Sequence, residues 1–178
     1  MIYYWYRLFR ILIGGKFQKK LSFEDVYTRS YRVGVFDCEG LRVMTSHKYF
    51  VYMDFIRWEM IARTNFFNAI VKKRLAPILG SQKIIHKKPI KLGTKFNVKL
   101  ETVGWDDKWL YCLHTFEQNG TIMAVGVTKG LVWKKDEPQA LMEVLINSGV
   151  TNLNKKTPNW VLQLFDNDKN ILSNTELN

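Results

Sequence analysis

The stretch Tyr49–Thr64, YFVYMDFIRWEMIART, decides the fold of this 178-residue chain. It contains neither glycine nor proline, and apolar residues lie on nearly every side of the helix that it would form. Such a helix is too apolar for a protein surface, where one face must remain polar. Thr45 or Ser46 is suited to capping its first turn with a side-chain oxygen. The stretch therefore predicts a central helix that the rest of the chain buries.

The segments on both sides of this helix predict strands. Val26–Cys38, VYTRSYRVGVFDC, alternates in polarity and is rich in β-branched and aromatic residues. After the central helix we expect a short basic helix at 66–74, and then turn signals separate four apolar segments. These segments predict strands at 81–92, 94–106, 108–118 and 121–134, the last three in consecutive hairpins, followed by an amphipathic helix at 138–147.

One strand, one buried helix and a run of antiparallel strands is the element order of an α+β fold. Because the helix is too apolar to face water, the antiparallel sheet must wrap around it. That arrangement is the hot-dog fold, and we expect it here.

Length and composition indicate one domain with its own core, because 47% of the residues are hydrophobic and 14% are aromatic. We divide the chain into an amphipathic helix with a basic linker (1–20), the hot-dog domain (21–148) and a C-terminal extension (149–178). The extension is rich in Asn and Lys, carries apolar residues at 160–165, and is expected to fray at its end.

The net charge of +11 points to an anionic partner. A phosphorylated ligand and an acidic membrane both satisfy it, whereas the chain shows no motif of a nucleic-acid-binding protein. Cys38 and Cys112 have no zinc-ligand spacing, and the three histidines are scattered, so we predict reduced thiols, no metal site and a cytoplasmic protein. His114, in the middle of a predicted strand, fits a hydrogen-bonded histidine of the core.

The N-terminal segment MIYYWYRLFRILIGG is too short and too charged to span a bilayer. On a helix, one face collects its apolar residues, which suits an interfacial helix at a membrane surface, helped by nearby basic residues. The same pattern suits a helix that packs on its own domain or on a partner subunit. The apolar face comprises Ile2, Trp5, Tyr6, Phe9, Leu12 and Ile13, and the basic residues are Arg7, Arg10, Lys16, Lys19 and Lys20.

Three stretches carry a resemblance to a known family. They are Tyr49–Thr64 with Asp54 and Arg57, then Pro77–Gly80, and Gly104–Trp109, GWDDKW. The chain resembles the hot-dog thioesterases of the 4-hydroxybenzoyl-CoA thioesterase type, in the thioesterase-superfamily-member branch, over about residues 4–160. This resemblance implies a homodimer or a tetramer with sites between subunits, and an acyl-CoA or acyl-carrier-protein substrate. It implies no cofactor beyond the coenzyme A of the substrate.

The family motif D-x-D-x-x-x-H-x-N-N-x-x-Y aligns without a gap to residues 37–49. Asp37 and Tyr49 match it and are expected to bind substrate. Glu39 replaces the family's second Asp, the base or nucleophile, with a side chain one methylene longer, although it also fits a solvated loop carboxylate. Val43 replaces the family His, and His47 is the substitute that we consider.

The chemistry of thioester hydrolysis needs a carboxylate and donors to the developing oxyanion. The backbone N–H groups of Ser46, His47 and Lys48, at the start of the central helix, are the expected oxyanion donors because they do not depend on side-chain identity. Lys87, Lys88 and Lys91 are expected to bind the phosphates of coenzyme A, although a charged edge strand has the same composition.

The sequence therefore predicts a thioesterase for a fatty or aryl acyl group, with activity weakened by the changes at Glu39 and Val43. A non-catalytic hot-dog module that binds acyl chains, a membrane or a protein is the alternative. Charged residues at two places on the central helix are interpreted separately. Asp54 and Arg57 fit an internal ion pair, and Glu59 fits a second carboxylate facing the substrate.

Overall fold

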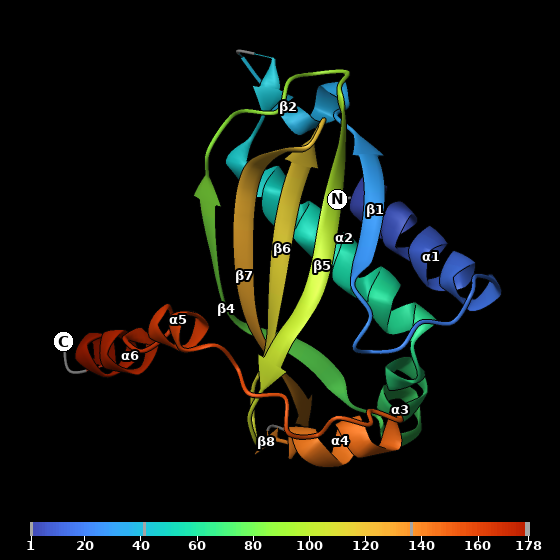
Figure 1. Ribbon diagram of the computed structural model, residues 1–178, viewed down its shortest axis with the longest axis vertical. Helices are drawn as coiled ribbons and strands as arrows, with labels where there is room; N and C mark the ends of the chain where they lie inside the picture. Colours follow the sequence, from blue (N-terminus) through green and yellow to red (C-terminus); the bar gives the residue numbers. More distant parts are fainter. Residues whose placement is uncertain (1, 41, 136, 177–178) are drawn as a thin grey trace.

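The computed structural model describes residues 2–40, 42–135 and 137–176. An antiparallel sheet curls around one long helix, α2 (Ser46–Arg63), as Figure 1 shows. The strand order is β1-β5-β6-β7-β4, and β8 pairs with the end of β7. This is the expected α+β arrangement, with β5, β6 and β7 in consecutive hairpins as predicted. The strands are β1 (Tyr27–Arg32), β4 (Ala76–His86), β5 (Lys95–Trp105), β6 (Leu110–Gln118), β7 (Thr121–Lys134) and β8 (Glu137–Pro138).

The central helix is buried as its sequence predicts, because Tyr52, Met53, Phe55 and Ile56 are all nearly inaccessible to solvent. The sheet approaches it closely at Gly126, where an added Cβ would lie 2.7 Å from the sulfur of Met53. The helix begins at Ser46, three residues before the predicted start at Tyr49, and Thr45 occupies the N-cap position. The expected side-chain cap is wrong, because the Thr45 hydroxyl pairs with Nδ1 of His47 at 2.9 Å and caps no backbone N–H.

The predicted strand Val26–Cys38 is correct only as far as Arg32. A 3₁₀ turn, η1 (Val35–Asp37), follows, and then a short hairpin of β2 (Cys38–Glu39) and β3 (Val43–Met44). The carboxylate of Asp37 accepts the N–H of Gly34 at 2.9 Å and holds this turn. Alternation along the chain could not reveal this, because the turn depends on one side chain folding back on the backbone.

The predicted strand at 81–92 begins earlier and ends earlier. It starts at Ala76 and stops at His86, because the N–H groups of both Lys87 and Lys88 donate to the carbonyl of Met123 and turn the chain away from the sheet edge. The helix predicted at 138–147 begins only at Leu141 (α4, Leu141–Asn147), because β8 takes up the preceding residues.

Four further helices of the described residues complete the layers. The N-terminal helix α1 (Ile2–Phe17) packs along α2, and α3 (Asn65–Lys73) follows α2 directly. The chain then ends in α5 (Asn159–Gln163) and α6 (Asp168–Glu176), on the outer side of the sheet. Because Gly126 faces α2, its neighbour Val127 points outward, where it packs in one cluster with Val161 of α5.

The C-terminal helix α6 is tied to the sheet by an ion pair of Lys129 and Asp168 at 2.8 Å. The expectation that this end frays is wrong for residues 168–176, since they form a helix, while residues 177–178 lie outside the described part. No helix among the described residues is both long enough and apolar enough to cross a bilayer.

Candidate active site

The predicted catalytic loop at 37–49 and the segment with the predicted phosphate-binding residues Lys87, Lys88 and Lys91 come together at the N-terminal end of α2. The N–H of Met44 donates to the carbonyl of Ile90 at 2.8 Å, and the N–H of Leu92 donates to the carbonyl of Arg42 at 2.8 Å. Val43 is thereby paired with Lys91. The loop that follows β4 therefore lies against the loop that carries Glu39, at the end of the molecule labelled β2 in Figure 1.

Asp37 is the buried carboxylate of this region, only 6% exposed. Its Oδ2 accepts hydrogen bonds from the hydroxyl of Tyr52 at 2.8 Å and from the N–H of Gly34 at 2.9 Å. Its Oδ1 lies 3.3 Å from Nζ of Lys48, and its backbone carbonyl accepts the N–H of Thr45 at 2.9 Å. Asp37 thus fastens the loop to the first turns of α2, and these partners already engage both carboxylate oxygens.

The Tyr52 and Lys48 contacts were not anticipated from the sequence. The only feature of the sequence that indicates these contacts is spacing, because Lys48 and Tyr52 are four residues apart and share one side of the helix. The burial of Tyr52 and its bond to Asp37 raise the pKa of its phenol far above the ordinary value.

The environment of Glu39 is the opposite of that of Asp37. It is exposed, lies opposite Val43 in the small hairpin, and no hydrogen bond or ion pair within the described residues engages its side chain. A carboxylate in this position is free to activate water or to remain solvated.

The start of α2 supplies backbone donors. Within the described residues, no hydrogen bond engages the N–H of Ser46 or of His47. The N–H of Lys48 donates to the carbonyl of Thr45 at 3.0 Å. Both His47 and Ser46 are exposed, so two free donors at a helix N-terminus face solvent, and Val43, the strand partner of Glu39, lies three residues before Ser46.

Tyr49 is buried beneath this surface. Its ring meets the edge of His86 at a centroid distance of 4.6 Å and lies 5.0 Å from Phe116. Burial raises the pKa of the Tyr49 phenol. His86, which the sequence suggested only as part of a basic run, therefore places an exposed imidazole beside the first turns of α2.

Lys87, Lys88 and Lys91 are all exposed on the loop that follows β4. They lie on the same side of the molecule as the small hairpin, since Lys91 pairs with Val43. Three ammonium groups within one short exposed segment form a concentration of positive charge at the edge of the candidate site.

The other carboxylates of α2 lie away from this end. Asp54 and Arg57 form the expected ion pair. Glu59 is 2% exposed, accepts a hydrogen bond from Tyr27 at 2.6 Å and lies 3.3 Å from Arg29. At 1.5 Å of rise per residue, Glu59 lies roughly 20 Å along the helix from Ser46. Its role as a second carboxylate of the same site is not supported within one chain.

His114 is a core residue, as expected, but no hydrogen bond within the described residues satisfies either of its ring nitrogens. Burial, with Arg57 nearby, holds the pKa of His114 well below its ordinary value, so its imidazole is neutral. Burial also raises the pKa of the Cys112 thiol to about 11, which leaves it protonated and unreactive. No cluster of His, Cys, Asp and Glu among the described residues is arranged to hold a metal ion.

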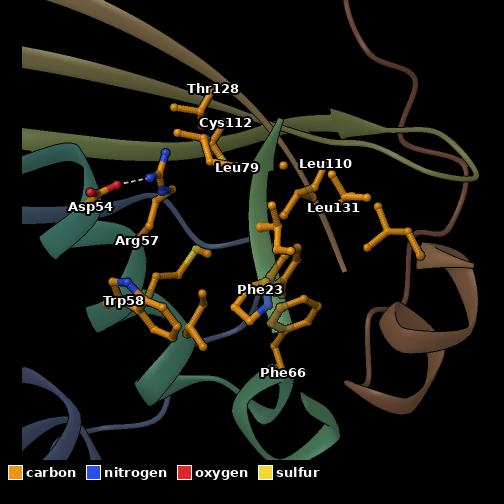
Figure 2. A pocket seen from close by; sticks show the side chains of 16 residues that line it. Phe23, Asp54, Arg57, Trp58, Phe66, Leu79, Leu110, Cys112, Thr128 and Leu131 are labelled. Atoms are coloured by element: carbon orange, nitrogen blue, oxygen red, sulfur yellow. Dashed lines mark hydrogen bonds and ion pairs between the residues drawn. The ribbon is translucent and has the colours of Figure 1, made fainter. Parts of the chain in front are cut away.

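A cavity of about 180 Å³ lies between the second half of α2 and the sheet, as Figure 2 shows. Its walls are mainly apolar, and the Asp54–Arg57 pair forms a polar section together with Cys112 and Thr128. The apolar walls include Phe23, Trp58, Phe66, Leu79, Leu110 and Leu131. The cavity is thus at the opposite end of α2 from Ser46.

A family model described as the thioesterase-like superfamily matches residues 33–165, which include the candidate site and the whole sheet beyond β1. The chain belongs to the thioesterase-like superfamily. It is also 25% identical to "Protein THEM6" of Drosophila melanogaster over 129 residues, 68% of this chain. The match spans 65% of the length of that relative.

Solved structures share the fold at low identity. A probable thioesterase from Escherichia coli has a TM-score of 0.62 at 14% identity, over 68% of this chain and 97% of its own. A 1,4-dihydroxy-2-naphthoyl-CoA thioesterase from Synechocystis has a TM-score of 0.57 at 15% identity, over 65% and 88%. A hypothetical protein from Staphylococcus aureus in complex with CoA has a TM-score of 0.59 at 16% identity, over 76% and 87%. The expected hot-dog fold is confirmed.

Proposed function

We propose that this protein is an acyl-CoA or acyl-carrier-protein thioesterase that hydrolyses a fatty or aryl thioester. One observation carries the proposal: within the described residues, two backbone N–H groups at the start of α2 are unengaged, and they follow directly on the hairpin in which Glu39, with its unpaired carboxylate, lies opposite Val43. In this mechanism Glu39 takes a proton from water as the water attacks the thioester carbonyl. The N–H groups of Ser46 and His47 stabilise the oxyanion, and the thiolate leaves with a proton. Direct attack by Glu39 on the carbonyl is the covalent version of the same chemistry.

The apolar cavity beside α2 supports an acyl-binding role. A cavity of about 150 Å³ lined by apolar side chains is known to hold benzene, so this cavity has room for one ring or a short chain. In a single chain it is separated from Ser46 by most of α2, and a second subunit is needed to bring a site and a cavity together.

We therefore propose a homodimer formed along β4, one of the two edge strands of the described sheet. Ile78 and Ile85 are exposed on it, 41% and 69%. The cavity lies at the Ala76 end of β4 and the candidate site at its His86 end. Antiparallel pairing of two β4 edges about a two-fold axis places the His86 end of one copy beside the Ala76 end of the other. Each site would then combine the loop of one copy with the cavity of its partner.

The lysines at the same edge fit the phosphates of coenzyme A. Lys87, Lys88 and Lys91 are exposed beside the small hairpin, where a carrier phosphate would follow an acyl group bound at Glu39. The neighbour from Staphylococcus aureus was solved with CoA, which supports this choice of carrier.

The second candidate function is a non-catalytic hot-dog module that binds acyl chains. Val43 carries no hydrogen-bonding group where the family motif has His, and this observation favours weak or absent turnover. Binding and hydrolysis separate the two candidates, because a module of this kind retains affinity for an acyl-CoA without cleaving it.

The test is hydrolysis of a panel of acyl-CoAs of varied size by wild-type protein, Glu39→Gln and the control Glu117→Gln. We expect release of free CoA by wild type and by the control, and a loss of at least a hundredfold in Glu39→Gln. If wild type and Glu39→Gln are equally inactive while calorimetry shows acyl-CoA binding, the protein is the non-catalytic module. If neither turnover nor binding is seen, both candidate functions fail.

A further inference from the structure

The helix α1 is fixed to the domain by one of its two apolar faces. The ring of Tyr4 stacks on Phe55 at 5.3 Å, and Leu8 is only 8% exposed. At Gly15 an added Cβ would lie 2.8 Å from the Cβ of Ala62, so the two helices touch there. This contact shows that the helix packs on its own domain, but through residues other than the apolar face predicted from the sequence, of which Trp5, Tyr6 and Phe9 are exposed. It also prevents α1 from turning another side outward.

The opposite face of α1 remains uncovered and is strongly apolar. We call Trp5, Tyr6, Phe9, Ile13 and Phe17 the outer face. Trp5, Phe9 and Phe17 are 62%, 64% and 86% exposed, and Tyr6 and Ile13 are also exposed. At 3.6 residues per turn these five positions point away from α2 along a single stripe. Soluble surfaces rarely group so many large apolar side chains, which marks the stripe as a contact surface.

The charges around the outer face have one sign. Arg10, Lys19 and Lys20 are exposed, and Arg10 lies 5.7 Å above the ring of Tyr6. No acidic residue occurs between positions 1 and 23. A second copy of the chain would bring the same basic residues together across such a contact, which is unfavourable. The stripe and its charges match a surface that is both apolar and anionic.

We propose that the outer face of α1 lies flat in the headgroup region of an anionic lipid bilayer. Trp and Tyr suit this depth because their rings are apolar while their N–H and O–H groups remain hydrated. The basic residues then lie at the level of the lipid phosphates. The proposal does not depend on thioester hydrolysis, since no residue of the outer face belongs to the candidate active site.

The test is co-sedimentation of full-length protein with vesicles of phosphatidylcholine alone or with 30% phosphatidylglycerol, a mixture of about one anionic lipid in three. We expect wild type to bind the anionic vesicles at least tenfold more strongly, and binding to fall as salt rises. Trp5→Ser with Phe9→Ser should reduce binding at least tenfold. Arg10→Gln with Lys19→Gln and Lys20→Gln should reduce it about a hundredfold, from roughly fivefold for each basic residue.

The matched control is Trp160→Ser, which removes a half-exposed tryptophan of α5 and should leave vesicle binding unchanged. All changed side chains are exposed, and circular dichroism of each variant checks that it is folded. Equal sedimentation of wild type and the Trp5/Phe9 variant would overturn the proposal. So would light scattering in which those two changes alter the oligomeric state and leave vesicle binding unaffected, since the outer face would then contact a second copy.

Discussion

Replacement of Asp37 by Ala tests whether this one carboxylate holds the candidate site together. Its side chain accepts hydrogen bonds from Tyr52 at 2.8 Å and from Gly34 at 2.9 Å, and it pairs with Lys48 at 3.3 Å. Net contributions of hydrogen bonds to a charged group are about 1.5–3 kcal/mol each, and neighbouring contributions do not add fully. We expect Asp37→Ala to lower the free energy of unfolding by about 3–4 kcal/mol.

The assay is urea denaturation followed by tryptophan fluorescence and circular dichroism. Tyr52→Phe removes one of the contacts and should cost only about 1–1.5 kcal/mol. Asp25→Ala, an exposed carboxylate that accepts one backbone N–H from Ser22 at 2.8 Å, should cost less than about 1 kcal/mol. A loss below about 1 kcal/mol for Asp37→Ala would refute the assigned role of this carboxylate.

Three further predictions concern the core and the tail. Gly126→Ala forces a Cβ to within 2.7 Å of the Met53 sulfur and should destabilise the protein by about 1–3 kcal/mol in the same urea assay. The pKa of His114 is lowered in the folded protein. When the pH falls below the ordinary histidine pKa of about 6.5, only the unfolded chain therefore binds a proton at this residue. Stability should thus fall by about 1.4 kcal/mol between pH 7.5 and 5.5, and this loss should be absent in His114→Leu. Val161→Ala, at a fully buried position of α5, should cost about 2 kcal/mol and expose the outer side of the sheet to proteolysis, whereas no change would show that the tail adds nothing to stability.

The local patterns of the chain were sufficient for the main elements. The all-round apolar character of Tyr49–Thr64 predicted a buried helix, and turn residues such as Asn119-Gly120 separated the strands of the hairpins correctly. These predictions hold because helix burial and hairpin turns depend on residues close together in sequence. The apolar face of the N-terminal helix was also recognised correctly, since Trp5, Tyr6, Phe9 and Ile13 do share one side.

Long-range contacts decided the candidate site. The pairing of Val43 with Lys91 joins two segments that no local pattern relates, and the buried Asp37 is hydrogen-bonded to Tyr52, 15 residues later in the chain. For the same reason Glu39 and Asp37, two carboxylates in one motif, have opposite environments, one exposed and one buried.

The sequence by itself determined a helix wrapped by an antiparallel sheet, the family to which the chain belongs, and an apolar, basic N-terminal helix. Only the tertiary structure decided which face of that helix remains uncovered, because the inner face is selected by the shape of α2 at Ala62 and Phe55. It also decided that the tail covers the outer side of the sheet, since Val127 and Val161 meet only after the strands have paired. The periodicity of the sequence indicates which residues share a face, whereas only tertiary packing determines what that face contacts.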